Sequence, residues 1–403
     1  MPSRRNLLIC GVGAMAALTL QLRLARVAHA ATVTNKRMII VILRGAMDGL
    51  SAVPPYGDRD YSRLRGDIAI GAPGAANGAI NLDGFFGLHP ALPFLGERFQ
   101  ADEMAVIHAA ATPYRSRSHF DGQDVLENGA KTPMGALDGW LNRALTLFSG
   151  SGQALAIAQT PSLILRGMAP VGSWAPDVLP PTQDDLMTRL AMLYDEDTLL
   201  GPALQEGMRI QTMSGATMGD GATDNKIKNA ASDNLAAMAT PVGRMLADPF
   251  GPRIAVFEMT GWDTHYNQGN FKGKLSNSLK ALDMGLSSLH ASLGSAWADT
   301  AVIVATEFGR TAAVNGARGT DHGTASAAFV LGGAISGGRV LGSWPGLAKN
   351  KLYEGRDLMP TSDLRALFSA ALIGHLGLDA VDVSTRVFPG GPSAGKFAEL
   401  FQG

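Results

Sequence analysis

The sequence predicts an α/β protein built on a doubly wound, mainly parallel sheet. Short apolar runs recur along the chain, and the clearest is Ala301–Ala305, which is β-branched and too compact for a helix. Runs of this kind are typical of strands buried on both faces. Amphipathic helical spacing lies between several of them, as βαβ units require. With 46% hydrophobic and 17% charged residues among 403, the chain can bury a large core.

Charge and cysteine content exclude several classes of function. The net charge of -1 provides no general cationic field, so we expect no binding to nucleic acid or to an acidic membrane surface. The single cysteine, Cys10, lies in the N-terminal segment described next. Any metal in the rest of the chain must therefore be held by carboxylate, imidazole or hydroxyl groups, and any nucleophile must be something other than a thiol.

The N-terminus has the pattern of a twin-arginine signal peptide over residues 1–30. Arg4-Arg5 precedes an apolar run, Leu7–Leu20, and Ala28-His29-Ala30 resembles a cleavage site. We expect a mature chain from Ala31, a periplasmic or secreted location, and the twin-arginine export machinery as a partner. The alternative is an anchor that is never cleaved. No later stretch reaches the roughly 18 apolar residues that a stable membrane span requires.

Buried strands and helices follow in order along the mature chain, which we expect to form one domain over residues 31–403. Apolar runs predict strands, and residues 162–165 are expected to form a hairpin with the strand before them. The predicted strands are Arg37–Leu43, Met104–Ala110, Ala154–Ala158, Ser162–Leu165, Arg253–Met259, Ala301–Ala305 and Ala325–Leu331.

Helical spacing predicts the segments between these strands. The Met- and Ala-rich region at about 180–250 is expected to be a helical insertion or cap that covers the site and offers a surface to a protein partner. Residues 54–87, rich in Gly, Pro and Asn, are expected to be a long irregular excursion. The other predicted helices are Pro90–Gln100, Gly122–Leu126, Leu275–Leu293 and Thr361–Leu376.

Polar side chains follow directly on the predicted strands. Asp48 comes after the first strand, Ser118 after the second, Asp263 and His265 after the fifth, and Glu307 after the sixth. Each has a simple alternative: an Asx-turn for Asp48, a helix cap for Ser118, and an ion-paired loop for Glu307. Taken together they favour a site, because ligands gather outside the carboxyl ends of strands in open α/β sheets.

Histidines divide into two groups. His322 lies on the loop that begins at Glu307, and Asp263 with His265 are spaced to reach one metal ion together. The remaining histidines of the mature chain stand in apolar or helical surroundings and are expected to be structural. These are His89, His108, His290 and His375, with His119 considered below.

The order of these motifs resembles the bacterial family called domain of unknown function 1501, whose members are exported by the twin-arginine pathway. The motifs that carry the resemblance are LRGAMDGL, SRSHFDGQD, GWDTHYNQ, TEFGRT and GTDHG. That family looks like a distant branch of the alkaline phosphatase superfamily, which includes phosphatases, arylsulfatases and phosphonate hydrolases. The resemblance implies a three-layer sandwich with a mixed, mainly parallel sheet and two divalent metals at its carboxyl edge.

The resemblance also implies roles for individual residues. Ser118 matches the hydroxyl nucleophile, with Ser116 as the alternative, and Arg44, Arg115, Arg117 or Arg310 is expected to hold the substrate anion. Asp263, His265 and His322 match ligands of the first metal, and Asp48 and Glu307 match acids of the second. The superfamily has Asp-His where this chain has Glu307-Phe308, so the missing imidazole would come from His119.

Two hypotheses of function follow. The first is an exported, metal-dependent hydrolase of phosphate or sulfate esters that acts on a small anionic substrate. Zinc is the expected metal, because it competes best for such ligands, with manganese, magnesium or calcium as alternatives. The second is an exported binding or assembly protein that retains the fold without turnover.

Overall fold

The computed structural model describes residues 35–148, 153–175, 200–217 and 235–401, with short runs at 190, 192–194 and 197–198. The predicted signal peptide lies outside the described residues. Within the described ranges, no helix combines the length and apolar character needed to cross a bilayer.

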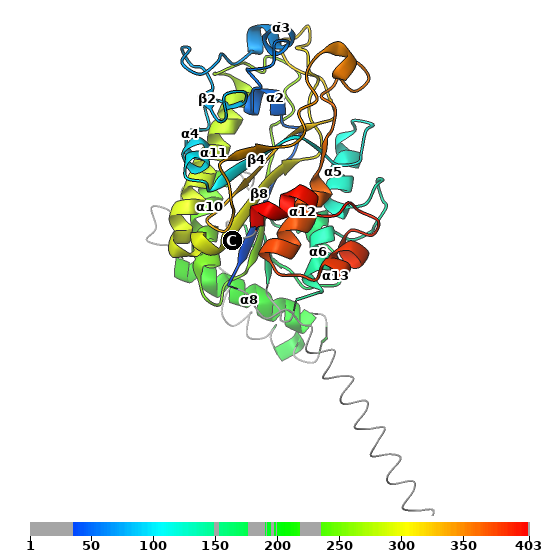
Figure 1. Cartoon of the computed structure of the whole chain (residues 1–403). Coiled ribbons are helices and arrows are strands. Elements are labelled where there is room, and N and C mark those ends of the chain that lie inside the picture. Colours follow the sequence, from blue (N-terminus) through cyan, green and yellow to red (C-terminus); the bar gives the residue numbers. More distant parts are fainter. Residues whose placement is uncertain are drawn as a thin grey trace, which may run out of the picture.

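A nine-stranded mixed sheet forms the middle layer of the protein (Figure 1). Its order is β10-β4-β9-β8-β1-β7-β5-β6, and β11 also pairs with β4. β9 runs antiparallel to both β4 and β8, whereas the other strand pairings within this nine-stranded sheet are parallel. The strands are β1 (Arg37–Leu43), β4 (Met104–Ala111), β5 (Ala154–Ala156), β6 (Gly172–Ser173), β7 (Ile254–Met259), β8 (Thr300–Thr306), β9 (Ser326–Leu331), β10 (Arg339–Leu341) and β11 (Ser362–Asp363).

Helices cover both faces of this sheet, so the predicted three-layer α/β fold is confirmed (Figure 1). One face carries α4 (Pro93–Gln100), α10 (Leu235–Ala247) and α11 (Lys274–Leu293), and the other carries α5 (His119–Asn128), α6 (Trp140–Leu145) and α12 (Leu364–Ala370). The shorter helices α2 (Gly49–Ala52), α3 (Tyr61–Arg65) and α13 (Ala380–Asp382) lie outside these two layers, as does α8 (Leu200–Thr217).

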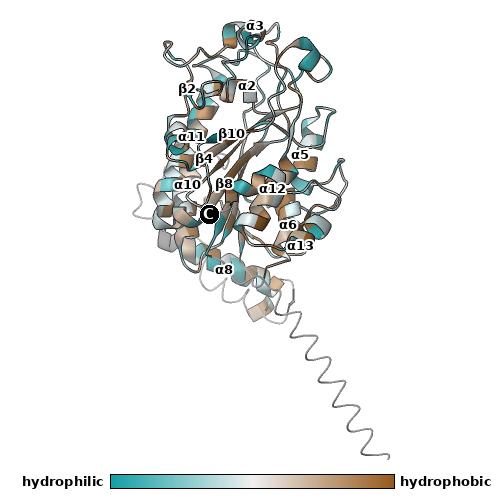
Figure 2. Ribbon diagram, in the orientation of Figure 1, coloured by the Kyte–Doolittle hydropathy of each residue, from teal (hydrophilic) through white to brown (hydrophobic). Residues whose placement is uncertain are grey.

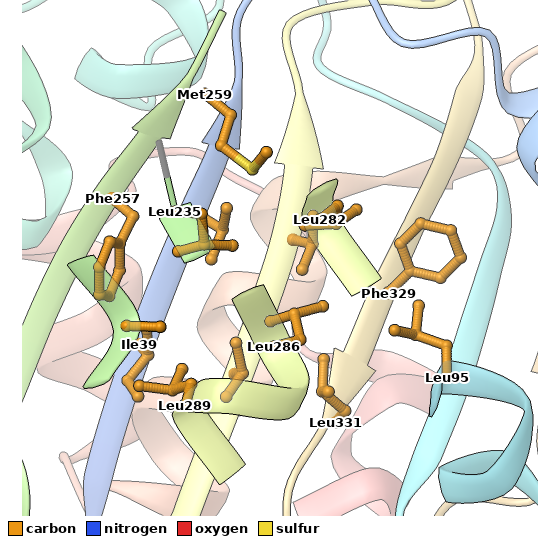
Figure 3. Packing of buried hydrophobic residues seen from close by; sticks show 14 of the residues in the cluster. Ile39, Leu95, Leu235, Phe257, Met259, Leu282, Leu286, Leu289, Phe329 and Leu331 are labelled. Carbon is orange, nitrogen blue, oxygen red and sulfur yellow. The ribbon is translucent and has the colours of Figure 1, made fainter. Parts of the chain in front are cut away.

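Alternation along each strand builds two cores. In β1, Ile39 and Val41 belong to the core under α10 and α11, and Ile40 and Ile42 belong to the opposite core. Figure 3 shows the first of these cores, where leucines of α11 pack between side chains of the strands. Since successive strand residues point to opposite faces, a continuous apolar run satisfies both layers. Figure 2 shows the same property as a hydrophobic sheet between helices whose outer sides are more polar.

Most predicted elements appear close to their expected bounds, but Ser162–Leu165 is not a strand. Leu163–Leu165 is a single 3₁₀ turn, and β5 pairs in parallel with β6 and β7 instead of forming a hairpin. The backbone of this turn bonds to side chains of the helices above it: Ile164 N–H donates to Glu127, and the Leu165 carbonyl accepts from Asn142. Because these backbone groups already have hydrogen-bond partners, they do not pair with a neighbouring strand.

The predicted helix at Thr361–Leu376 begins later than expected. Ser362–Asp363 first pairs with β4, and α12 then starts with Asp363 as its cap, whose side chain accepts from Arg365 N–H. The helix continues as a π-helical turn over Ala371–His375. The helix therefore starts three residues after the predicted start, and a side-chain oxygen caps its first turn.

The helices described within region 180–250 do not cover the edge of the sheet where the candidate residues gather. α10 packs along α11 as part of the outer layer. α8 contacts α10 and β6 at the end of the molecule away from α2, which follows β1 (Figure 1). The expected cap over the site is not found in these helices, because their apolar faces are used against the sheet and each other. The rest of the region lies outside the described residues.

Candidate metal centre

Three imidazoles and one carboxylate converge at the carboxyl edge of the sheet. His119 begins α5 after β4, Asp263 and His265 follow β7, and His322 lies just before β9. His265 Nε2 is 3.0 Å from Asp263 Oδ1 and 2.8 Å from His322 Nε2. His322 Nε2 is 3.6 Å from Asp263 Oδ1, and His119 Nε2 is 3.6 Å from Asp263 Oδ2. Three segments far apart in sequence thus meet at one carboxylate.

Each of these imidazoles is oriented from behind by an acceptor at Nδ1. Glu307 Oε1 lies 2.8 Å from His119 Nδ1, the Arg117 carbonyl lies 2.9 Å from His322 Nδ1, and Asp321 Oδ1 lies 3.3 Å from His265 Nδ1. An acceptor at Nδ1 assigns the proton to that nitrogen and leaves the Nε2 lone pair free. All three Nε2 lone pairs then face Asp263, as in metal sites where outer carboxylates and carbonyls orient the ligating histidines.

The donor set fits a divalent cation. His119 Nε2 is buried and has no hydrogen-bond partner, which is costly for a polar atom unless something else binds there. Ligand atoms of His119, Asp263 and His322 all lie within 4.8 Å of one another. Imidazole nitrogens with one carboxylate oxygen suit zinc and its first-row neighbours better than calcium or magnesium, which prefer oxygen.

The electrostatics keep the His322 imidazole neutral and the Asp263 carboxylate ionised. Burial lowers the pKa of His322, and the neighbouring His119 and Arg310 act in the same direction, so its imidazole stays neutral. Burial would raise the pKa of Asp263, but a hydrogen bond and the charge of Arg310 outweigh burial and hold it below its ordinary value. Neutral imidazole and ionised carboxylate are the forms that bind metals.

Glu307 is a buried carboxylate that contacts the cluster through the ring of His119. Its Oε1 accepts from Gly45 N–H at 2.9 Å, from His119, and from Gln123 at 3.3 Å, while its Oε2 accepts from Thr306 at 2.8 Å. Burial alone would raise its pKa, yet these hydrogen bonds lower it, so the side chain is ionised. These contacts show Glu307 holding the ring of His119. Direct binding of a metal by Glu307 stays a prediction.

Asp48 belongs to a separate buried network, which does not agree with its predicted role as a ligand of a second metal. Its Oδ2 accepts from the guanidinium of Arg65, from Ser51 at 2.8 Å and from Gln268 at 2.6 Å. Arg65 is fully buried and carries the positive charge that opposes Asp48. Arg65 therefore supplies the cation for this carboxylate, while Asp48 Oδ1 is buried without a hydrogen-bond partner.

The arginines predicted to hold an anion are engaged within the chain. Arg310 is buried and donates to the carbonyls of Ala46, Gly45, Thr320 and Trp262 and to Asp263. The other three have partners as well: Arg44 pairs with Glu127 and Glu258, Arg117 with Glu354 and Asp357, and Arg115 donates to the carbonyls of Thr112 and Tyr114. These contacts brace the loops, so the predicted role of Arg44 and Arg310 as anion holders is not supported.

Ser118 occupies the N-cap position of α5, but its hydroxyl makes no capping hydrogen bond. Its backbone N–H donates to the Tyr114 hydroxyl at 3.1 Å, which fixes the turn. The neighbours on either side, Arg117 through its carbonyl and His119 through its ring, both contact the cluster. Ser118 therefore lies beside the cluster at the start of a ten-residue helix. Ser116, the alternative nucleophile, is exposed.

Sequence reasoning missed the residues that support the cluster from outside. Asp357 is fully buried and binds both Arg117 and Arg356, which in turn contact the backbone carbonyl or ring of His322. Nothing in the sequence around Asp357 indicates this role. Gly45 does carry a signal: it is at φ +116, and a Cβ there would lie 2.7 Å from Asp263 N, so only glycine permits this approach.

The structural histidines are confirmed as parts of the framework. His89, His108 and His375 each place Nε2 within 2.8–3.1 Å of a backbone carbonyl, those of Asn270, Val53 and Arg37 respectively. His290 lies edge-on to Trp297 and at a tilt to Phe94.

Comparisons with solved structures give low similarity throughout. A crystal structure of Ps i-CgsB in complex with k-i-k-neocarrahexaose matches with 12% identity and a TM-score of 0.41, over 86% of this chain and 73% of that one. The C-terminal periplasmic domain of EcEptC from Escherichia coli, in complex with Zn, matches with 11% identity and a TM-score of 0.33, over 74% and 73%. A candidate sulfatase from Bacteroides thetaiotaomicron matches with 10% identity and a TM-score of 0.36, over 75% and 66%. With TM-scores below 0.5, none of them assigns a substrate or a reaction to this chain.

Sequence comparison is more direct. No curated protein matches the chain significantly. The sequence profile of the family described as Protein of unknown function (DUF1501) matches residues 102–385, which is well over half of the chain and includes all four residues of the cluster. The chain therefore belongs to the family Protein of unknown function (DUF1501), as the order of its motifs predicts.

Proposed function

We propose that this protein is an exported, metal-dependent hydrolase of phosphate or sulfate esters that holds one divalent cation. The observation that carries the proposal is the convergence of three Nε2 atoms on Asp263, each imidazole held from behind, with His119 Nε2 buried and unpartnered. In a metal-free cluster Arg310 would still donate to Asp263, but the Nε2 lone pairs of His265 and His322 would face each other at 2.8 Å and His119 Nε2 would stay without a partner.

His119, His265, His322 and Asp263 would hold the cation, with zinc favoured by the donor set. A bound divalent cation would supply Lewis-acid chemistry, lowering the pKa of a hydroxyl and neutralising charge on the ester oxygens. Glu307 and Asp321 keep two of the imidazoles in position, and Arg310 holds Asp263 in its ionised form.

Ser118 is the proposed nucleophile. Its hydroxyl is not used for capping, and the free N–H groups at the start of α5 provide a positive electrostatic environment for an anion. In the first step the Ser118 oxygen attacks phosphorus or sulfur, the bond to the ester oxygen breaks, and the proton lost by the serine balances the alcohol that leaves. Water then hydrolyses the serine ester and restores the hydroxyl.

The test combines metal analysis with turnover. The exported protein is purified from the periplasm without chelator, its metal content is measured, and it is assayed with p-nitrophenyl phosphate, p-nitrophenyl sulfate and a p-nitrophenyl phosphodiester. We expect about one zinc per chain and hydrolysis of at least one ester. Ser118→Ala should lose turnover and keep the metal, and the matched control Ser116→Ala should retain both. A well-folded, metal-free protein would refute the proposal.

A second candidate is an exported binding or assembly protein that retains the metal and turns over nothing. The observation that favours it is the pairing of Asp48 with Arg65, which leaves fewer positions for ions than the family resemblance implies. Turnover separates the two candidates. If zinc is bound and no ester is hydrolysed, while Ser118→Ala behaves as wild type in every assay, the binding protein is the better description.

A further inference from the structure

We propose that the substrate of this site carries a single negative charge, as a sulfate monoester or a phosphodiester does, and that dianionic phosphate monoesters are disfavoured. The inference rests on the proposed function and narrows its substrate class. It follows from how the chain distributes its buried and half-buried charges around the cluster of His119, Asp263, His265 and His322.

Arg310 contributes no donor to a substrate. Its side chain is buried, and its three nitrogens donate to four backbone carbonyls and to Asp263. Its charge is balanced by Asp263. A guanidinium whose donors are already bound cannot form the bidentate contact by which arginine recognises a phosphate.

Arg44 is outnumbered by acids. Its Nε lies 2.6 Å from Glu258, its Nη2 lies 2.8 Å from Glu127, and its Nη1 donates to Gln123 at 2.8 Å. Burial would lower the pKa of Arg44, but the two carboxylates raise it, so the group is one cation between two anions. Gln123 in turn donates to Glu307, which connects this net negative group to the support of His119.

The groups around His322 are balanced. Arg117 binds Asp357 and Glu354, and Arg356 binds Asp357 and the His322 carbonyl. Two cations therefore oppose two anions. Arg318 and Lys274, the first residue of α11, are exposed, so water and salt screen their charge.

Of the two carboxylates that orient imidazoles, Glu307 has no arginine or lysine partner among the described residues, whereas Arg356 partly offsets the charge of Asp321 and lowers its pKa. Glu307 is fully buried beside His119, and Asp321 lies against His265. A divalent cation at the cluster would be surrounded by Asp263, Glu307 and Asp321. Arg310 and Arg356 add positive charge there, and Arg356 is already paired with Asp357. The centre therefore has little positive charge to spare, and a second negative charge on the ligand meets like charges.

The test compares esters with one leaving group and different charge. Zinc-loaded wild type is assayed at pH 8 with p-nitrophenyl sulfate, ethyl p-nitrophenyl phosphate and p-nitrophenyl phosphate. Binding of the same compounds to zinc-loaded Ser118→Ala is measured by calorimetry, which reports on charge preference without turnover. We expect at least a tenfold tighter binding of a monoanion than of p-nitrophenyl phosphate, and the same order in kcat/KM.

A charge variant tests the cause. Glu258→Gln removes one of the two acids beside Arg44 and should narrow the preference for monoanions several-fold. The matched control is Glu206→Gln, which removes the acid paired with Arg209 on α8, at the other end of the molecule, and should leave the preference unchanged.

The outcomes separate this inference from the proposed function. If p-nitrophenyl phosphate is hydrolysed and bound as well as the monoanionic esters or better, the charge preference is overturned and the proposed hydrolysis of phosphate or sulfate esters still stands. Binding of monoanions without any hydrolysis would support the charge preference and remove the proposed reaction. Binding of none of the three compounds would overturn both.

Discussion

Replacing Glu307 by Gln tests whether the buried carboxylate tunes the metal centre through His119. The change keeps the shape of the side chain and removes its charge. The amide oxygen can still accept at the Oε1 position, where Gly45, His119 and Gln123 donate, and the amide nitrogen can face the Thr306 hydroxyl. The fold should therefore tolerate the variant, while His119 loses a charge-assisted hydrogen bond.

The expected magnitude follows from the geometry. Loss of a partner that orients a ligating histidine typically weakens metal affinity by about 10–100-fold, which is about 1.4–2.7 kcal/mol at 1.36 kcal/mol for each factor of ten. Zinc affinity is measured by competition with a chromogenic chelator, and the stability of the metal-free protein is measured by urea denaturation. We expect the affinity to fall and the metal-free stability to change by much less than it does in the control variant.

The matched control is Asp283→Asn. Asp283 is a buried acid on α11 that accepts from the N–H groups of Phe94 and Leu95, on the face of the sheet that carries α4, α10 and α11. It should alter stability and leave zinc affinity unchanged. An E307Q protein that binds zinc within twofold of wild type would refute the reasoning, because the bond at His119 Nδ1 would then have no influence on Nε2.

Three further predictions concern other parts of the molecule. Asp263→Ala should abolish the zinc-dependent rise in melting temperature, since a ligand of the folded state at a hundredfold excess over its dissociation constant stabilises by about 2.7 kcal/mol; an unchanged rise in differential scanning fluorimetry would exclude Asp263 as a ligand. Asp48→Asn should leave the zinc content at one per chain but lower the free energy of unfolding by up to about 3–5 kcal/mol, because it leaves Arg65 buried without its anion; loss of zinc in elemental analysis would restore Asp48 to the metal site. Burial lowers the pKa of His108 and His375 to about 4, so these residues take up protons below pH 6.5 in the unfolded chain but only near pH 4 in the folded chain. The free energy of unfolding should therefore be level above pH 6.5 and fall by roughly 3 kcal/mol per histidine towards pH 4. Denaturation midpoints that do not change between pH 7.5 and pH 5 would contradict this.

Local sequence was sufficient for the sheet and for the edge where the side chains gather. In a continuous apolar run such as Arg37–Leu43 or Thr300–Thr306, side chains on both faces of the strand are buried. The run itself therefore predicts a strand with a layer packed on each face. Polar residues directly after such runs must then lie at one edge, because parallel strands end together. The same reasoning failed at Ser162–Leu165, where the partners of the backbone are side chains of distant helices.

The roles of the residues at that edge depend on partners that only the folded chain brings together. Asp48 and Asp263 have equal standing in the sequence, yet Arg65 neutralises the first, while the second faces three imidazoles. Glu307 and His119 are 188 positions apart, and only the folded chain brings the carboxylate against the imidazole. The sequence by itself determined the central strands of the sheet, the polar residues that follow them and the family, but not β6, β10 and β11. Tertiary structure decided which charges meet, because pairing depends on distances across the fold that no local pattern encodes.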